Sequence, residues 1–474
     1  MKSFIKSLTC LVALLLFSSP AFANTTEALP IDTGNTTWVL VSAALVFLMT
    51  PGLAFFYGGM VRSKNVLSTI MHSFFIISVV SVIWFVLGYS LVFSGDISGV
   101  IGNLDKAGLA HLNGQILEST HIPELAFVAF QCMFAVITPA LISGAFAERI
   151  KFTGFLFFTI WSLFIYIPMA HWVWGGGFLA ELGALDFAGG LVIHILSGVS
   201  GLMLCILLGK RKGYGQSPML PHHLPMTVLG ASLLWFGWFG FNAGSALGAV
   251  DLAANAFIVT QAAAATATLG WVACEWFFHG KPTILGAASG CIAGLVAITP
   301  AAGYVSLFPS LLIGLLGGII CYFAISVLKN KLGYDDTLDS FGIHGIGGTW
   351  GSLATGLFAS LEVNPEGANG LFYGDSELLI AQIISTIVAI LLALIGTYVI
   401  YKIISLFTSV RASAEEETAG MDVSEHGESA YNTSMFSSNT LASSLVLTNE
   451  HPVNTTFPSD SVTLPPDVSS TINS

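Results

Sequence analysis

Long apolar runs separated by short polar segments dominate the chain from residue 38 onward. Each run is close to the roughly 20 residues that a helix needs to cross a bilayer. The eleven runs lie at 38–60, 67–93, 124–147, 153–173, 187–208, 225–245, 255–278, 283–299, 306–328, 341–359 and 376–407. The pattern predicts an all-α polytopic membrane protein with eleven transmembrane helices.

The composition agrees with this class. Hydrophobic residues make up 54% of the 474 residues, charged residues only 9%, and the mean hydropathy is +0.81. These values exclude an ordinary soluble domain. The sequence contains no metal-ligand cluster, nucleophile elbow or phosphate loop, so we expect no enzyme activity, no metal, no cofactor and no nucleic-acid partner.

The first residues predict the orientation in the membrane. Residues 1–23 combine Lys2, Lys6, a short apolar run and a small-residue end, which is typical of a cleaved signal peptide. A mature chain that starts outside near Asn24 places twelve of its thirteen basic residues inside and only Lys106 outside. The positive-inside rule therefore favours an external N-terminus and a cytoplasmic C-terminus in a cell inner membrane.

The C-terminal part has a different composition. Residues 412–474 contain nine acidic residues, no Lys or Arg, and many Ser, Thr and Pro. We interpret 24–411 as the membrane domain, 412–431 as a cytoplasmic regulatory tail and 432–474 as a disordered extension. Most of the formal charge of −12 lies in this region, so it says little about what crosses the membrane.

Two of the apolar runs share a motif. Leu185-Asp186-Phe187-Ala188-Gly189-Gly190 leads to His194 in the fifth run, and Leu338-Asp339-Ser340-Phe341-Gly342-Ile343 leads to His344 in the tenth. Units of five spans have opposite orientations, so the pattern predicts two five-helix inverted repeats plus a final helix. An ionisable residue inside a span is costly and marks a functional candidate. The pattern does not determine whether the two histidines touch.

A second group of residues is expected at the outer mouth. The predicted topology brings aromatic rings, one hydroxyl and one carboxylate together there, from Phe130, Phe134, Trp174, Ser245 and Asp186. Aromatic faces attract a compact cation. The lining below is mostly apolar and would oppose a bare cation, whereas an imidazole can accept or donate a proton. The residues indicate a solute that is a small cation at the mouth and neutral in the lumen.

Seven stretches carry a resemblance to a known family. They are PGLAFFYGGMVRSKN, GAFAERIKF, AHWVWGGG, LDFAGGLVIH, GWFGFNAGSA, FGIHGIGGTWG and GMDVSEHGESAY, spread over residues 24–431. In these stretches the chain resembles the ammonium transporter family (Amt/Mep/Rh) of the bacterial type. The motifs are long and ordered along the whole membrane domain.

The resemblance implies a role for each candidate residue. Phe130, Phe134, Trp174 and Ser245 match the family's outer recruitment site, Asp186 its buried supporting acid, Phe134 and Phe241 its stacked gate, and His194 and His344 its twin-histidine pore. Family members form homotrimers with one pore per subunit. They bind NH4+, separate its proton and pass NH3, and electrogenic members carry the proton as well. The tail motif implies docking on the cytoplasmic face, coupling of subunits and a PII-type signalling partner.

Other interpretations stay open. Asp186 and Asp339 can serve as helix caps, and Trp174 can belong to the interfacial belt, to which we assign Trp172 and Trp238. The alternatives for the function are an electroneutral NH3 or CO2 gas channel and an ammonium sensor. Residues 412–474 contain no recognisable signalling domain, which disfavours the sensor.

Overall fold

The structure is a computed structural model in which residues 29–431 are described. The predicted signal peptide, residues 1–23, and the predicted extension, residues 432–474, lie outside the described residues. The chain divides into two units, Met1–Ala430 and Tyr431–Ser474, and the fold below is that of the first.

The described part of the chain is built from helices and contains no β-strand, only three isolated bridges. The α-helices are α2 (Thr33–Met60), α3 (Val66–Ile83), α4 (Tyr89–Phe93), α5 (Glu124–Phe146), α6 (Phe152–Phe158), α7 (Ile167–Trp174), α8 (Phe178–Glu181), α9 (Leu196–Leu208), α10 (Leu224–Gly244), α11 (Asp251–His279), α12 (Ile284–Ile298), α13 (Leu307–Phe323), α14 (Lys329–Leu332), α15 (Ile346–Phe358), α16 (Glu377–Ser405) and α17 (Ala414–Ala419). Short 3-10 turns cover η1 (Ser63–Asn65), η3 (Ala107–Leu109) and η8 (Leu371–Tyr373).

Six π-helical segments interrupt or extend these helices. They are η2 (Trp84–Gly88), η4 (Ser162–Tyr166), η5 (Gly190–Ile195), η6 (Ala324–Leu328), η7 (Phe341–Gly345) and η9 (Asp422–His426). π-Helical turns occur often at functional sites. Here η5 and η7 begin the fifth and tenth predicted spans and contain the two candidate histidines.

Nine helical stretches within residues 29–431 are long and apolar enough to cross a membrane. They coincide with nine of the eleven predicted spans. The other two predicted spans contain α12, and η7 followed by α15. The 15 residues of α12 extend about 22 Å, less than the roughly 30 Å of a hydrocarbon core. The helical membrane fold is confirmed, and the count of eleven stays a prediction.

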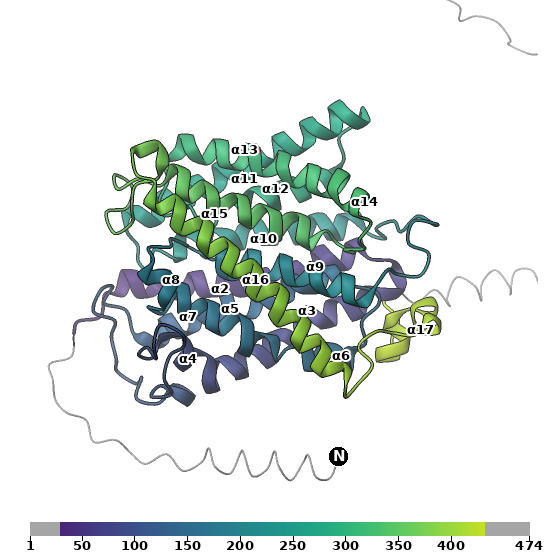
Figure 1. Ribbon diagram of the computed structural model, residues 1–474, viewed down its shortest axis with the longest axis horizontal. Helices are drawn as coiled ribbons and strands as arrows, with labels where there is room; N and C mark the ends of the chain where they lie inside the picture. Colours follow the sequence, from purple (N-terminus) through teal and green to yellow (C-terminus); the bar gives the residue numbers. More distant parts are fainter. Residues whose placement is uncertain (1–28, 432–474) are drawn as a thin grey trace, which may run out of the picture. The chain divides into compact units, whose positions relative to one another are not determined.

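The two predicted repeats meet through helices of equivalent position. Helix α2 packs along α10, which are the first and sixth spans, and η5 and α9 pack against η7 and α15, the fifth and tenth. The α2–α10 contact is close, because a Cβ added at Gly230 would lie 2.2 Å from the backbone nitrogen of Phe56. The last span, α16, runs obliquely across α15 and α9 (Figure 1).

One end of the bundle, called here the tail end, carries residues 412–430. Helix α17 begins with a capping box made by Ser413 and Glu416, and Figure 1 shows it beside the helix ends. The Lys64 ammonium donates to the carbonyls of Glu417 and Thr418, each at 2.7 Å. The tail is therefore folded back on its own chain.

Buried ion pairs join the loops at the tail end. The Arg211 guanidinium contacts Asp335 at 2.8 Å and Glu148 at 3.0 Å, and Arg62 contacts Glu148 at 2.7 Å. Burial alone would raise the pKa of Asp335, but the hydrogen bonds and charge of Arg211 lower it below its usual value. This cluster connects the ends of α2, α5 and α9 with the segment before η7.

Candidate functional site

Three aromatic rings gather at the opposite end of the bundle, called here the cage end. The ring centroids of Phe130 and Phe134 lie 4.8 Å apart, and those of Phe134 and Trp174 lie 6.1 Å apart, nearly perpendicular. The Trp174 indole N–H donates to the Asp186 carbonyl at 2.8 Å. Helices α5 and α7 therefore bring together three of the predicted cage residues.

Ser245 lies directly after α10 at the same end. Its hydroxyl donates to the Phe241 carbonyl at 2.9 Å, which leaves the oxygen lone pairs as acceptors. Gly244 makes room for the cage, because a Cβ added there would lie 2.9 Å from the Phe130 ring. Ser245 thus offers a hydrogen-bond acceptor and no free donor.

The phenylalanine pair lies between the cage and the histidines. Phe134 and Phe241 are stacked, with centroids 4.4 Å apart and planes 23° apart, and both side chains are buried. Phe134 also contacts Trp174 in the cage, while Phe241 lies 6.1 Å from the His194 ring. The two stacked rings therefore connect Trp174 on one side with His194 on the other.

The two candidate histidines meet in the middle of the bundle. Their Nδ1 atoms are 3.3 Å apart, and their rings are nearly parallel, with centroids separated by 5.3 Å. Within residues 29–431, the Nε2 atom of His194 has no hydrogen-bond partner. Close packing holds the pair, because a Cβ added at Gly198 would lie 2.0 Å from the Gly345 nitrogen, next to His344.

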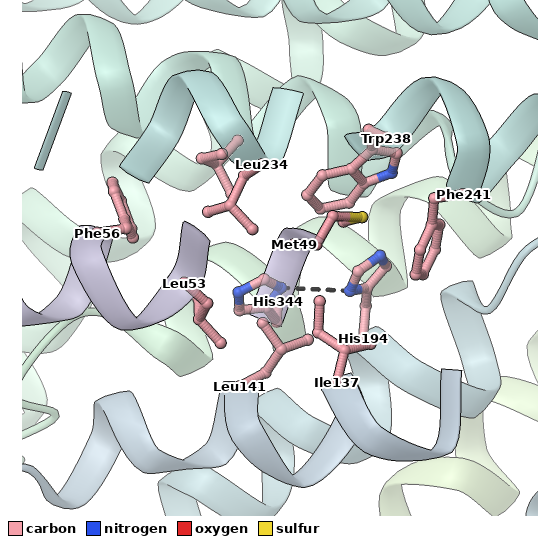
Figure 2. A pocket seen from close by; sticks show the side chains of 11 residues that line it. Met49, Leu53, Phe56, Ile137, Leu141, His194, Leu234, Trp238, Phe241 and His344 are labelled. Carbon is pink, nitrogen blue, oxygen red and sulfur yellow. Dashed lines mark hydrogen bonds between the residues drawn. The ribbon is translucent and has the colours of Figure 1, made fainter. Parts of the chain in front are cut away.

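A narrow cavity surrounds the histidine pair. Figure 2 shows the imidazoles inside it, with Trp238 and Phe241 beside His194. The cavity measures about 10 Å³, close to the least space that a single water-sized molecule needs. Apart from the histidines its lining is apolar, formed by Met49, Leu53, Phe56, Ile137, Leu141, Leu234, Trp238, Phe241 and Ile292.

Asp186 acts on the site through the backbone. Its carboxylate accepts four N–H groups, from Gly189, Gly190, Leu191 and Val192, at 2.6–3.1 Å. It therefore caps η5, whose next turn carries His194. Because its carbonyl also holds the Trp174 indole, Asp186 links the cage to the histidine segment.

The equivalent acid in the second repeat is Asp336. Its carboxylate accepts the N–H groups of Ser340 and Phe341 at 3.1 and 2.7 Å and caps η7. The interpretation of Asp339 as the cap is therefore wrong, since its carboxylate instead contacts the Lys329 ammonium at 2.6 Å. Spacing offered the missing signal, because Asp336 precedes His344 by the same eight residues that separate Asp186 from His194.

The assignment of Trp238 to the interfacial belt is also wrong. Its side chain is buried, its indole donates to the Thr299 hydroxyl at 2.9 Å, and its ring stacks on His194 at 5.5 Å. The sequence contained a signal, because Trp238 precedes Phe241 by three residues and so shares its helix face. Trp238 is thus a cavity residue that sequence reasoning missed.

Fold and site together define a polytopic helical membrane protein whose two halves enclose a narrow apolar cavity. The family model described as Ammonium Transporter Family matches residues 37–431. The ammonium transporter of Bacillus subtilis is 55% identical over 404 residues, which cover 85% of this chain and 99% of that relative. The chain belongs to the ammonium transporter family.

Solved structures agree with this placement. The crystal structure of Saccharomyces cerevisiae Mep2 has a TM-score of 0.76 and 36% identity, and the match covers 81% of this chain and 89% of that one. A structure described as Sensor Amt Protein has a TM-score of 0.77 and 28% identity, over 83% of this chain and 98% of that one. The similarity extends across the membrane domain.

Proposed function

We propose that this protein transports ammonium across the inner membrane, with the cage end outside and the tail end in the cytoplasm. The observation that carries the proposal is the buried histidine pair in an apolar cavity, behind the stacked rings of Phe134 and Phe241. Burying two ionisable side chains in an apolar cavity costs free energy, and such residues within membrane spans usually mark a functional site.

The cage suits NH4+ for electrostatic reasons. The faces of Phe130, Phe134 and Trp174 each attract a cation by roughly 0.5–2 kcal/mol, depending on desolvation. The Ser245 hydroxyl donates to Phe241 and so presents only lone pairs to the cation. An N–H donor of ammonium can bind these lone pairs, whereas K+ forms no hydrogen bond. The cage therefore favours ammonium.

The cavity suits NH3. It holds one water-sized molecule among apolar side chains, where an unpaired cation is costly. Ammonium therefore gives up its proton to the histidine pair once the rings of Phe134 and Phe241 are displaced, and it continues through the cavity as ammonia. The imidazoles supply the hydrogen-bonding groups that ammonia meets there.

The Nδ1–Nδ1 contact sets the protonation of the pair. Two neutral imidazoles have two N–H groups, and the contact uses one of them. The other lies on the Nε2 atom of the accepting ring, so the pair exposes one Nε2–H and one bare Nε2. The bare Nε2 accepts a proton from ammonium, the shared proton passes from Nδ1 of that ring to Nδ1 of the other, and the Nε2–H proton of the second ring leaves, which gives net charge transfer.

Assembly and regulation complete the proposal. A homotrimer with one pore per subunit follows the family resemblance. The tail is folded on its own chain through Lys64, Glu417 and Thr418, and this supports a docked regulatory segment that a PII-type signalling partner binds on the cytoplasmic face. Residues 1–23 direct the chain to the membrane as a cleaved signal peptide.

Two alternatives have specific support. The apolar cavity also suits an electroneutral channel for NH3 or CO2. The similarity to a structure described as Sensor Amt Protein, at 28% identity, supports an ammonium sensor as the second alternative.

Current measurements on a solid-supported membrane separate the three candidates. Purified protein in liposomes receives an ammonium jump, with a potassium jump as the control. A current with ammonium alone is the expected result. Faster ammonia-driven pH changes without current would instead identify a neutral channel, and silence in both assays would favour the sensor.

A further inference from the structure

His171 in α7 lies between two hydrogen-bond acceptors at the cage end. Its Nδ1 is 2.7 Å from the carbonyl oxygen of Val92, and its Nε2 is 2.9 Å from a carboxylate oxygen of Asp96. The imidazole is fully buried, whereas the Asp96 side chain is 37% exposed. The proposed transport mechanism gives this pair no role.

The contacts decide the protonation of the ring. A carbonyl oxygen only accepts hydrogen bonds, and so does an ionised carboxylate, whereas neutral imidazole has a single N–H. With the exposed Asp96 carboxyl ionised, both contacts are satisfied together only by an imidazolium. The hydrogen bond from His171 and the N–H of Gly99 lower the pKa of Asp96, which keeps it ionised.

His171 also ends the helix that carries Trp174. Its carbonyl accepts the N–H groups of Gly175 and Gly177 at 2.9 and 3.0 Å, which turns the chain directly after Trp174. The packing there is tight, because a Cβ added at Gly175 would lie 2.0 Å from the Val92 carbonyl oxygen. His171 thus fixes the end of α7 against the end of α4.

We propose that His171, as an imidazolium paired with Asp96, is the positioning residue for Trp174 and sets the cage's affinity for ammonium over other monovalent cations. This inference rests on the proposed cage. The carboxylate of Asp96 balances the charge of the imidazolium. The His171–Asp96 pair can therefore hold the Trp174 ring in place without repelling a cation in the cage.

The ring of His171 is held by contacts from α4, from the segment after α4 and from the turn after α7. The Val92 carbonyl of α4 and the Asp96 carboxylate in the segment after α4 contact the ring, and Gly175 in the turn after α7 packs beside it. Asp96 is therefore the titratable side chain in contact with His171.

Four variants in liposomes test the positioning role by ammonium currents. His171→Phe and Asp96→Ala break the pair and should raise KM about tenfold, with the maximal current within about twofold and weaker discrimination against potassium. Asp96→Asn is the conservative variant, because its amide can donate to Nε2 of a neutral ring. It should keep KM within about twofold.

The matched control is His121→Asn. His121 lies in the connection between α4 and α5, which also contains Asp96. His121 contacts the Pro30 carbonyl and has a φ of 55°, a conformation that Asn tolerates. This variant should leave KM and discrimination unchanged. Wild-type KM and discrimination in both His171→Phe and Asp96→Ala would overturn the positioning role.

Solid-state ¹⁵N NMR of the reconstituted wild-type protein tests the charge directly. The His171 signals are assigned by their loss in His171→Phe. Two protonated ring nitrogens at neutral pH are the expected result, with one bare nitrogen in Asp96→Asn. A neutral ring in the wild type would overturn the inference. The NMR signal does not depend on transport. An absent ammonium current would therefore contradict the proposed function but not the charge assigned to His171.

Discussion

Trp174 shows how a single side chain joins two parts of the site. Its ring faces Phe134, and its indole N–H is bound to the Asp186 carbonyl. An aromatic residue that only marked the membrane interface would need neither contact. We therefore treat its ring as part of the cage and its N–H as part of the support.

Replacing Trp174 with leucine should weaken ammonium binding. The loss of one ring removes roughly 0.5–2 kcal/mol of cation attraction, so KM should rise about twofold to thirtyfold and competition by potassium should increase. Currents in reconstituted liposomes measure both. Trp276→Leu, on an exposed position of α11, is the control. Unchanged competition by other monovalent cations would argue against the cage.

At the scale of elements, the two π-helical segments explain why acids and histidines recur together. Each segment is buried and forms the first turn of a span, so its unpaired backbone N–H groups need an acceptor. Asp186 supplies it for η5 and Asp336 for η7. The capping acids thus hold the backbone that carries His194 and His344.

Asp186→Ala should therefore abolish ammonium transport. The variant leaves four buried N–H groups without their acceptor, and each such loss costs about 1–3 kcal/mol. Asp186→Glu keeps the charge but lengthens the side chain, so it should fold and transport slowly. Size-exclusion profiles and ammonium currents measure folding and transport. Full activity of the alanine variant would reduce Asp186 to a dispensable cap.

The ion-pair cluster at the tail end predicts an acid-sensitive stability. Asp335 has a pKa below its usual value of about 4, so its contribution is present above that pH and is lost as the pH falls through the lowered pKa. Asp335→Asn should cost about 3 kcal/mol at neutral pH, because it removes one partner of the buried Arg211.

Thermal unfolding in detergent measures this effect. The difference in Tm between wild type and Asp335→Asn should be largest near neutral pH and should shrink below about pH 4. Glu362→Gln, which changes an exposed acid, is the control and should show little difference. A difference in Tm that does not change with pH would contradict the assignment to the carboxylate charge.

At the scale of the whole molecule, apolar periodicity was sufficient to predict the helical membrane fold and the helix positions. Topology and motifs also predicted that Phe130, Phe134 and Trp174 lie near one another, and their rings do, while their role as a cage stays a proposal. The π-helical segments were not predictable, because their hydrophobic pattern matches that of an α-helix. The choice between Asp336 and Asp339 depends on a local turn, where Asp339 adopts a φ of 62° and turns toward Lys329.

Trp238 was misassigned for a related reason. An aromatic residue near the end of a span is usually interfacial. The spacing from Phe241 indicates a shared helix face, but the contact of the Trp238 ring with His194 is seen only in the folded chain. The fold of the tail likewise depends on contacts between segments that are far apart in sequence. Glu417 is buried against the loops that follow α2 and α9.

In the proposed mechanism the histidine pair couples ammonium transport to charge. The most direct test measures net charge and nitrogen uptake in the same liposomes after an ammonium jump, for wild type and for His194→Ala combined with His344→Ala. We expect one charge per nitrogen for the wild type and no charge-coupled transport for the double variant. Nitrogen uptake without charge in the wild type, or wild-type currents in the double variant, would contradict the account.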